Sequence, residues 1–259
     1  TRVDASLLDA APNLMVVGRL GVGLDNIDLN ACTERKVIVY PATGANDAAV
    51  AEWVIASTML LLRGAFLSRN QMQKGEWPRT QAMGHETAGK TLGLVGFGQI
   101  ARYTAKLAQA LGMKVIAYDP YVDPNDDCWM GIGRIDELYE LLRIADIVSL
   151  HVPLTDTTRH LIDTQAIGQM KKGAILINAS RGGVLEEDAL VRAMKSDDIS
   201  GAALDVYETE PLTAASAAKF GGLPNLLLTP HIAGVTIESN QRVSQVTMEN
   251  VRRVLEASK

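Results

Sequence analysis

The sequence predicts an α/β protein in which a doubly wound parallel sheet domain is accompanied by a smaller, incomplete domain. From Lys90 onward, short apolar runs alternate with amphipathic helical patterns. Such alternation requires crossover connections, which place helices on both faces of a parallel sheet. Some runs are apolar at every position, as at residues 174–177, which is typical of strands buried on both faces. Before Lys90 the chain has only two further strand-like runs.

The smaller domain is predicted from the first part of the chain. Residues 13–19 and 37–40 are predicted strands, and residues 24–35 between them predict a short helix. Two parallel strands leave edges and faces uncovered, so we expect one or more βα units of this domain to precede Thr1.

A long helix and an irregular segment follow these two strands. Asn46 or Asp47 can cap an apolar-periodic helix over residues 47–69, because a side-chain oxygen can accept from the N–H groups of the first turn. Residues 75–89 contain several glycines and the pair Trp77-Pro78, which indicates an irregular segment.

The larger domain continues in regular alternation to a C-terminal helix. Strands are predicted at 91–96, 114–118, 147–151, 174–178, 201–205 and 226–229. Helices are predicted at 100–111, 136–144, 163–170, 186–195 and 237–259. Ligands of such sheets bind beyond the carboxyl ends of the strands, so the residues that follow each strand are the candidates for chemistry.

A glycine turn predicts a dinucleotide site. Gly96 and Gly98 follow the first strand of the larger domain and allow the backbone to approach a pyrophosphate. The next helix begins near Gln99 and Ile100, and the free N–H groups of these residues would face that anion. Asp119 ends the second strand, 21 residues after Gly98, where a carboxylate accepts the ribose hydroxyls. This acid would repel a 2′-phosphate, so we expect NAD rather than NADP.

One arginine, one glutamate and one histidine follow three further strands. Arg181 can grip a carboxylate with its planar fork, and His231 can transfer a proton near neutral pH. Glu210 can orient the imidazole and stabilise its charged form. Each has a purely structural alternative, as a turn residue, a solvated acid or a carbonyl cap. Three such residues at one sheet edge beside a nucleotide site favour hydride transfer to a 2-oxoacid.

Other polar positions have simpler interpretations. His151 ends a strand and is expected to line the cofactor cleft, and the acids at 186–188 open a helix, where the dipole favours them. The turn at residues 21–23 could bind an anionic carboxylate through its N–H groups, or it could be a simple tight turn.

Composition excludes several classes of protein. The 259 residues carry a net charge of −5 without a basic stripe, which argues against nucleic acid or a membrane surface as partner. The longest apolar stretch is too short to span a bilayer. Cys32 and Cys128 lack metal-ligand spacing and the four histidines lack zinc-binding pairs, so we expect no metal and reduced thiols in the cytoplasm.

Motifs along nearly the whole chain resemble those of one enzyme family. They lie at residues 18–28, 49–52, 89–93, 151–154, 178–182 and 229–231, together with the glycine turn. By these motifs the chain resembles the D-isomer-specific 2-hydroxyacid dehydrogenases, a family that includes phosphoglycerate dehydrogenase and glyoxylate/hydroxypyruvate reductase. The resemblance implies that the first βα units of the family are missing ahead of Thr1.

The resemblance implies roles for individual residues. Arg181, Glu210 and His231 would be the catalytic set. The backbone of Val22 and Gly23, with Arg181, would hold the substrate carboxylate. Further cofactor contacts are implied for Val152, Pro153, Thr158, Ala179, Asp205 and Gly234, of which Asp205 would contact the nicotinamide carboxamide.

The resemblance also implies the domain organisation. A flavodoxin-like substrate domain would comprise residues 1–42 and 233–259, and an NAD-binding Rossmann domain residues 43–232. Closure of the two domains would exclude water. A homodimer is expected through the helix at 47–69, with the irregular segment at 75–89 in the same interface.

We therefore expect an NAD-dependent oxidoreductase that interconverts a small 2-oxoacid and its D-(R)-2-hydroxyacid. Phosphoglycerate, hydroxypyruvate or glyoxylate, and sulfolactate remain open as substrates. The alternative from another class is a non-catalytic, NAD-sensing binding protein, because transcriptional corepressors that resemble the family keep the same three residues.

Overall fold

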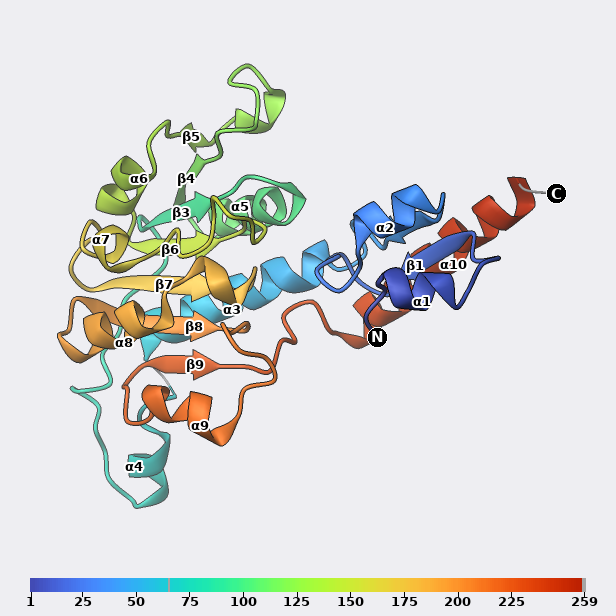
Figure 1. Ribbon diagram of the computed structural model, residues 1–259. Coiled ribbons are helices and arrows are strands. Elements are labelled where there is room, and N and C mark those ends of the chain that lie inside the picture. Colours follow the sequence, from blue (N-terminus) through green and yellow to red (C-terminus); the bar gives the residue numbers. More distant parts are fainter. Residues whose placement is uncertain (65, 258–259) are drawn as a thin grey trace. The chain divides into compact units, whose positions relative to one another are not determined.

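The computed structural model describes residues 1–64 and 66–257 and divides into two compact units (Figure 1). The larger unit is Val50–Ala233, and the smaller one combines Thr1–Ala49 with the segment from Gly234 onward. The first division falls inside helix α3 (Asp47–Arg63), whereas the sequence placed it between residues 42 and 43.

The larger unit is built on one seven-stranded sheet in which every neighbouring pair is parallel. Its strand order is β5-β4-β3-β6-β7-β8-β9 (Figure 1). The strands are β3 (Thr91–Val95), β4 (Lys114–Tyr118), β5 (Gly133–Arg134), β6 (Ile147–Leu150), β7 (Ala174–Asn178), β8 (Ile199–Leu204) and β9 (Leu226–Leu228). The order reverses at β3, whose neighbours are β4 and β6. This reversal opens the crevice in which doubly wound sheets bind ligands.

Helices cover both faces of this sheet, as the apolar strands predict. Alternate residues of β7 point to opposite faces: Ile175 and Ile177 lie in one core cluster with Leu61 of α3 and with α5 (Gln99–Ala110). Leu176 lies in the other cluster with Leu190 of α8 (Glu187–Lys195). The fold class predicted from the sequence is confirmed.

The remaining helices of the larger unit are short. They are α4 (Arg69–Gln73), α6 (Leu138–Ile144), α7 (Thr164–Ile167) and α9 (Ala214–Ala217), with 3₁₀ turns η1 (Asp127–Trp129), η2 (Gly182–Val184) and η3 (Ala218–Phe220). The six predicted strands of this unit are present, but β5 was not predicted because two residues carry no periodic pattern.

The prediction of one helix over residues 47–69 is wrong. Helix α3 ends at Arg63, and Gly64 adopts a left-handed conformation (φ 54°) with its N–H bonded to the Leu60 carbonyl at 2.9 Å. Glycine ends helices readily in this conformation. Asn46 does not supply the expected cap, because its buried Oδ1 has no hydrogen-bond partner.

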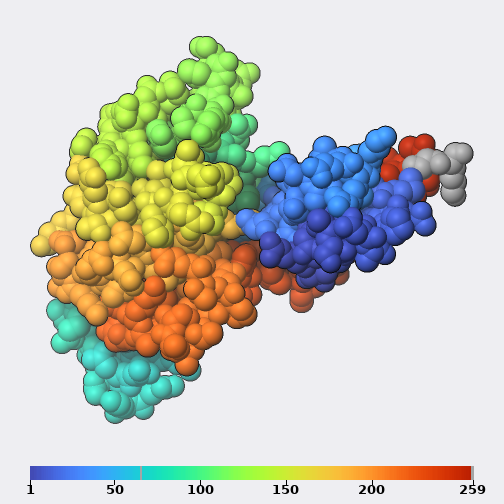
Figure 2. All heavy atoms as spheres, in the orientation of Figure 1, coloured from blue at the N-terminus to red at the C-terminus, as the bar shows by residue number. Residues whose placement is uncertain are grey.

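The segment around α4, drawn in teal, forms a lobe at the lower edge of the larger unit in Figures 1 and 2. Apolar side chains are exposed there: Trp77 is 77% exposed and Met83 79%.

The smaller unit contains a two-stranded parallel sheet of β1 (Val16–Arg19) and β2 (Ile38–Pro41). Helices α1 (Ala5–Asp9), α2 (Leu29–Glu34) and α10 (Ile237–Ala257) belong to this unit. Asp28 caps α2 by accepting the Ala31 N–H at 2.9 Å, so this helix begins later than the predicted residue 24. A Cβ on Gly18 would lie 2.7 Å from the Thr247 side chain, which shows how closely α10 packs on β1.

In the described residues, no helix combines the length and apolar character needed to cross a membrane.

Candidate active site

Gly96 directly follows β3, at the point where the sheet order reverses. Its φ of 91° lies in the region that favours glycine, and an added Cβ would lie 2.9 Å from Val152 Cγ1 and 3.0 Å from the His151 carbonyl. A side chain at this position would therefore push β3 away from the strand-end residues of β6.

Gly98 serves a different purpose. It is the N-cap of α5 in an extended conformation, and as glycine it has no side chain to accept from the first N–H groups of the helix. An added Cβ on Gly98 would meet no described protein atom within 4 Å, so the space in front of the helix is open. The first N–H groups of α5, from Gln99 and Ile100, are thus accessible to an anion. This cradle fits the pyrophosphate of a dinucleotide.

Asp119 lies directly beside the glycine turn. Its Oδ2 accepts the Phe97 N–H at 2.8 Å and its Oδ1 accepts the Tyr121 N–H at 2.9 Å. These bonds fix the carboxylate at the end of β4. Each oxygen retains a lone pair for a ribose hydroxyl, while the negative charge disfavours a 2′-phosphate.

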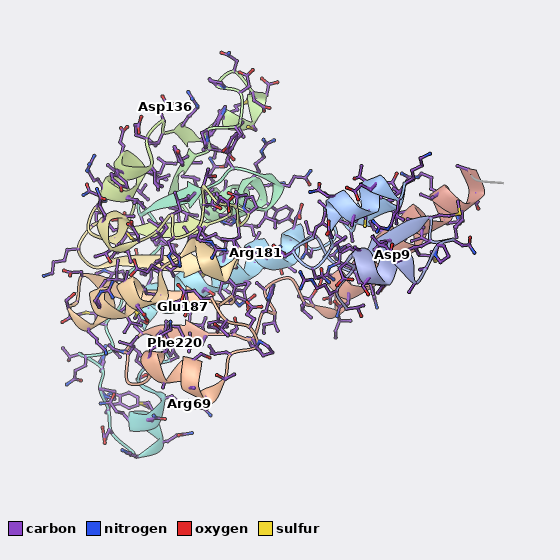
Figure 3. The ribbon with its side chains drawn as sticks, viewed as in Figure 1. Asp9, Arg69, Asp136, Arg181, Glu187 and Phe220 are labelled. Carbon is purple, nitrogen blue, oxygen red and sulfur yellow. The ribbon has the colours of Figure 1, made fainter. Side chains whose placement is uncertain are left out.

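The turn after β7 presents Arg181. Asn178 organises this turn: its Oδ1 accepts the Ser180 N–H at 3.0 Å, and its Nδ2 donates to the Arg181 carbonyl at 2.9 Å. The Arg181 guanidinium lies beyond the carboxyl end of the strand (Figure 3) and donates to the Ser180 carbonyl at 2.6 Å.

Glu210 and His231 form a hydrogen-bonded pair. The distance from Glu210 Oε2 to His231 Nδ1 is 2.8 Å, and Glu210 Oε1 accepts the Tyr207 N–H at 3.0 Å. The His231 side chain is 54% exposed, so a substrate can reach the imidazole. Because Nδ1 faces the carboxylate, the opposite nitrogen, Nε2, is the one that can exchange a proton.

Asp205 anchors the loop that carries His231. Asp205 as a whole is 1% exposed. Oδ1 accepts from the Thr229 hydroxyl at 2.5 Å and from the Ile232 N–H at 2.8 Å, and Oδ2 accepts the Ala233 N–H at 2.7 Å. Sequence reasoning missed this role, since it depends on backbone groups that no motif reveals. The implied contact of Asp205 with nicotinamide stays a prediction.

The other residues implied by the resemblance lie in both units. In the larger unit, the Val152 side chain lies next to Gly96, where it would clash with an added Cβ. The Thr158 hydroxyl donates to the Pro153 carbonyl at 2.6 Å, and Ala179, directly after β7, packs against a core cluster. In the smaller unit, Arg19 Nε donates to the Gly23 carbonyl at 3.1 Å and holds the turn that includes exposed Val22. The Gly234 carbonyl accepts the Ser239 hydroxyl at 2.8 Å.

His151 is electrically neutral at physiological pH. Its Nε2 lies 2.9 Å from the Ser149 hydroxyl, and burial lowers the pKa of His151 to about 4. His151 therefore differs from His231 in environment, although both follow strands of the same sheet.

Among the described residues, no group of three histidine, cysteine or acidic side chains is arranged to hold a metal ion.

This combination of a doubly wound sheet, a glycine cradle with an acid beside it and a histidine–carboxylate pair defines an NAD-dependent dehydrogenase. Comparison with known proteins identifies its family. Residues 55–233 match the family model described as D-isomer specific 2-hydroxyacid dehydrogenase, NAD binding domain. The chain belongs to the D-isomer-specific 2-hydroxyacid dehydrogenase family.

Two curated relatives illustrate the range of the family. The chain is 54% identical over 255 residues to the (S)-sulfolactate dehydrogenase of Chromohalobacter salexigens, covering 98% of this chain and 82% of the relative. It is 39% identical to the D-3-phosphoglycerate dehydrogenase of Methanocaldococcus jannaschii, of which it spans only 48% while 98% of this chain is covered.

A solved structure confirms the fold. The glyoxylate reductase from Paecilomyes thermophila superposes with a TM-score of 0.90 at 32% identity, covering 100% of this chain and 77% of the other.

We predict that His151 makes the protein less stable in mild acid. Unfolded histidine binds a proton below pH 6.5, whereas folded His151 does so only near pH 4. The contribution of His151 to the free energy of unfolding is therefore fully present above pH 6.5, and it is lost progressively as the pH drops from 6.5 towards 4. In urea unfolding, His151→Gln should reduce the loss of unfolding free energy between pH 7.5 and pH 5 by about 1–2 kcal/mol. Identical losses in both proteins would contradict this assignment.

Proposed function

We propose that Arg181, His231 and Glu210 carry out the acid–base part of hydride transfer to a 2-oxoacid, and that the substrate is 3-sulfopyruvate, reduced to (S)-sulfolactate. The 2.8 Å hydrogen bond between Glu210 and His231 supports the catalytic assignment most directly. The 54% identity to a sulfolactate dehydrogenase supports the substrate.

Each of the three side chains has a defined task. NADH, when bound, supplies the hydride that adds to C2 of the oxoacid. Arg181 forms paired hydrogen bonds to the substrate carboxylate and polarises the neighbouring carbonyl. His231 gives its Nε2 proton to the developing alkoxide, and Glu210 stabilises the imidazolium that does so. In the oxidative direction, His231 accepts the hydroxyl proton.

The stereochemistry of sulfolactate is compatible with a D-specific family. In lactate the carboxylate outranks the methyl group, so the D-form carries the descriptor R. In sulfolactate the sulfur-bearing carbon outranks the carboxylate, so the same spatial arrangement carries the descriptor S. The R descriptor expected from the sequence therefore becomes S for this substrate without any change in the hydride-receiving face.

We predict a preference for 3-sulfopyruvate among 2-oxoacids. NADH oxidation by the full-length gene product should be measured with 3-sulfopyruvate, 3-phosphohydroxypyruvate, hydroxypyruvate and glyoxylate. We expect kcat/KM to be at least about tenfold higher for 3-sulfopyruvate, corresponding to about 1.4 kcal/mol of transition-state binding. A higher value for another oxoacid would refute the substrate. Tight NADH binding without reduction of any oxoacid would favour the NAD-sensing alternative.

The catalytic roles predict the effects of three substitutions. His231→Gln, Arg181→Ala and Glu210→Gln should each lower kcat, the first two by about 10²–10⁴-fold, because proton transfer and carboxylate binding are lost. The dissociation constant of NADH, measured by fluorescence, should stay unchanged. His85→Gln, at an exposed position, is the matched control. Turnover close to wild type in His231→Gln would exclude the proposed acid.

We propose that two copies associate through α3 and the lobe around α4. The exposed side chains of Met59, Met72, Trp77 and Met83 would supply the apolar contact, since association would remove their apolar surface from water.

Light scattering tests this association. The full-length gene product should have twice the mass of one copy, and Trp77→Ser should shift it towards the single copy while NADH binding persists. A single-copy mass for the wild type at micromolar concentration would contradict a dimer.

We also propose a cytoplasmic location, which rests on Cys32 and Cys128. Both are free thiols in the structure, as expected in a reducing compartment. Fractionation of cells that express the tagged gene product tests this location, and recovery in an extracytoplasmic fraction would contradict it.

A further inference from the structure

A buried acid lies beneath the loop that carries Glu210. Glu187, the first residue of α8, is 3% exposed. The helix dipole accounts for an acid at this place in the sequence, but such acids normally lie in solvent. A carboxylate is almost never this buried unless it is paired, so its burial requires specific partners.

The first partner is the backbone next to Glu210. Glu187 Oε1 accepts the Glu208 N–H at 2.7 Å. In return, Glu208 Oε1 accepts the Glu187 N–H at 3.3 Å. These reciprocal bonds join the start of α8 to the loop after β8.

The second partner is Lys219 of η3. Its ammonium nitrogen lies 2.7 Å from Glu187 Oε2, 3.2 Å from Asp188 Oδ1 and 3.8 Å from Glu208 Oε2. Burial alone would lower the pKa of Lys219, but the hydrogen bonds to Glu187 and Asp188 outweigh it and raise that pKa. Figure 3 shows Glu187 close to Phe220, the neighbour of Lys219 in η3.

The same loop is held from its other side. An added Cβ on Gly182 would lie 1.9 Å from the Tyr207 carbonyl carbon, so the turn after Arg181 presses directly on the loop. The Tyr207 N–H in turn holds Glu210 Oε1 at 3.0 Å. Residues 207–210 are thus fixed between Gly182 and Glu187.

We propose that Glu187, paired with Lys219, is a positioning residue that holds Glu210 against His231 through the Glu208 backbone. This inference rests on the proposed function, in which Glu210 stabilises the charged imidazole. Glu187 itself touches neither substrate nor cofactor.

A double-mutant cycle tests the proposal. Glu187→Gln replaces a charged acceptor by a weaker neutral one and leaves Lys219 near Glu208. We expect kcat to fall about tenfold, because displacements of about 1 Å in catalytic groups have effects of this size or larger. The NADH dissociation constant should not change. In the Glu210→Gln background, Glu187→Gln should have no further effect on kcat, since its effect passes through the Glu210 carboxylate.

Two further variants complete the design. Lys219→Gln removes the partner of Glu187 and should also lower kcat. Because Lys219 is partly exposed, this variant keeps the proposal testable if Glu187→Gln folds poorly. Glu186→Gln is the matched control. The Glu186 carboxylate pairs with Arg192 at 3.0 Å and accepts the Thr164 N–H at 3.3 Å, so its bonds do not involve residues 207–210. Its kcat should equal that of wild type.

The outcomes separate the two proposals. If Glu187→Gln keeps the wild-type kcat, or if its effect multiplies with that of Glu210→Gln, the positioning role is wrong while the proposed function stands. If Glu210→Gln alone keeps the wild-type kcat, the proposed function itself fails.

Discussion

The parallel arrangement of one sheet is the constraint on which the candidate site depends. Parallel strands all end at the same edge, so the loops after β3, β4, β7, β8 and β9 leave the sheet on one side. Residues far apart in the sequence, such as Gly96 and His231, therefore reach one region without any local signal that joins them. Burial on both faces keeps the strands in register and the loops in place.

Carboxylates bonded to backbone N–H groups shape these loops. Asp119 fixes the glycine turn, Asp205 fixes the His231 loop, and Glu187 fixes the loop before Glu210. A carboxylate accepts several N–H groups at once, and charge-assisted bonds are stronger than neutral ones. Loops without regular structure thereby acquire the rigidity that catalytic geometry demands.

Features that depend on hydrophobic periodicity and motif spacing could be predicted from the sequence. Features that depend on backbone conformation or on partners far away in the chain could not. Six of the seven strands of the larger unit follow from their apolar runs. The strand-end rule places Glu210 and His231 at the same edge of the sheet, where the structure shows their hydrogen bond. The break at Gly64 was missed because the apolar pattern continues past a glycine whose conformation the pattern does not specify. Glu187 was assigned to the helix dipole because its partner Lys219 lies 32 residues later in the chain, on a separate turn.

The backbone of His231 has an evolutionary consequence. Its φ of 57° is left-handed, a conformation that glycine and asparagine adopt with little strain and β-branched residues adopt poorly. The proposed acid–base role of His231 would keep histidine at this position under selection despite the local strain. In a gene duplicate that had lost the reaction, we expect this position to change to glycine or asparagine, because these residues fit the left-handed backbone. The residue found there would then indicate whether the duplicate still catalyses the reaction.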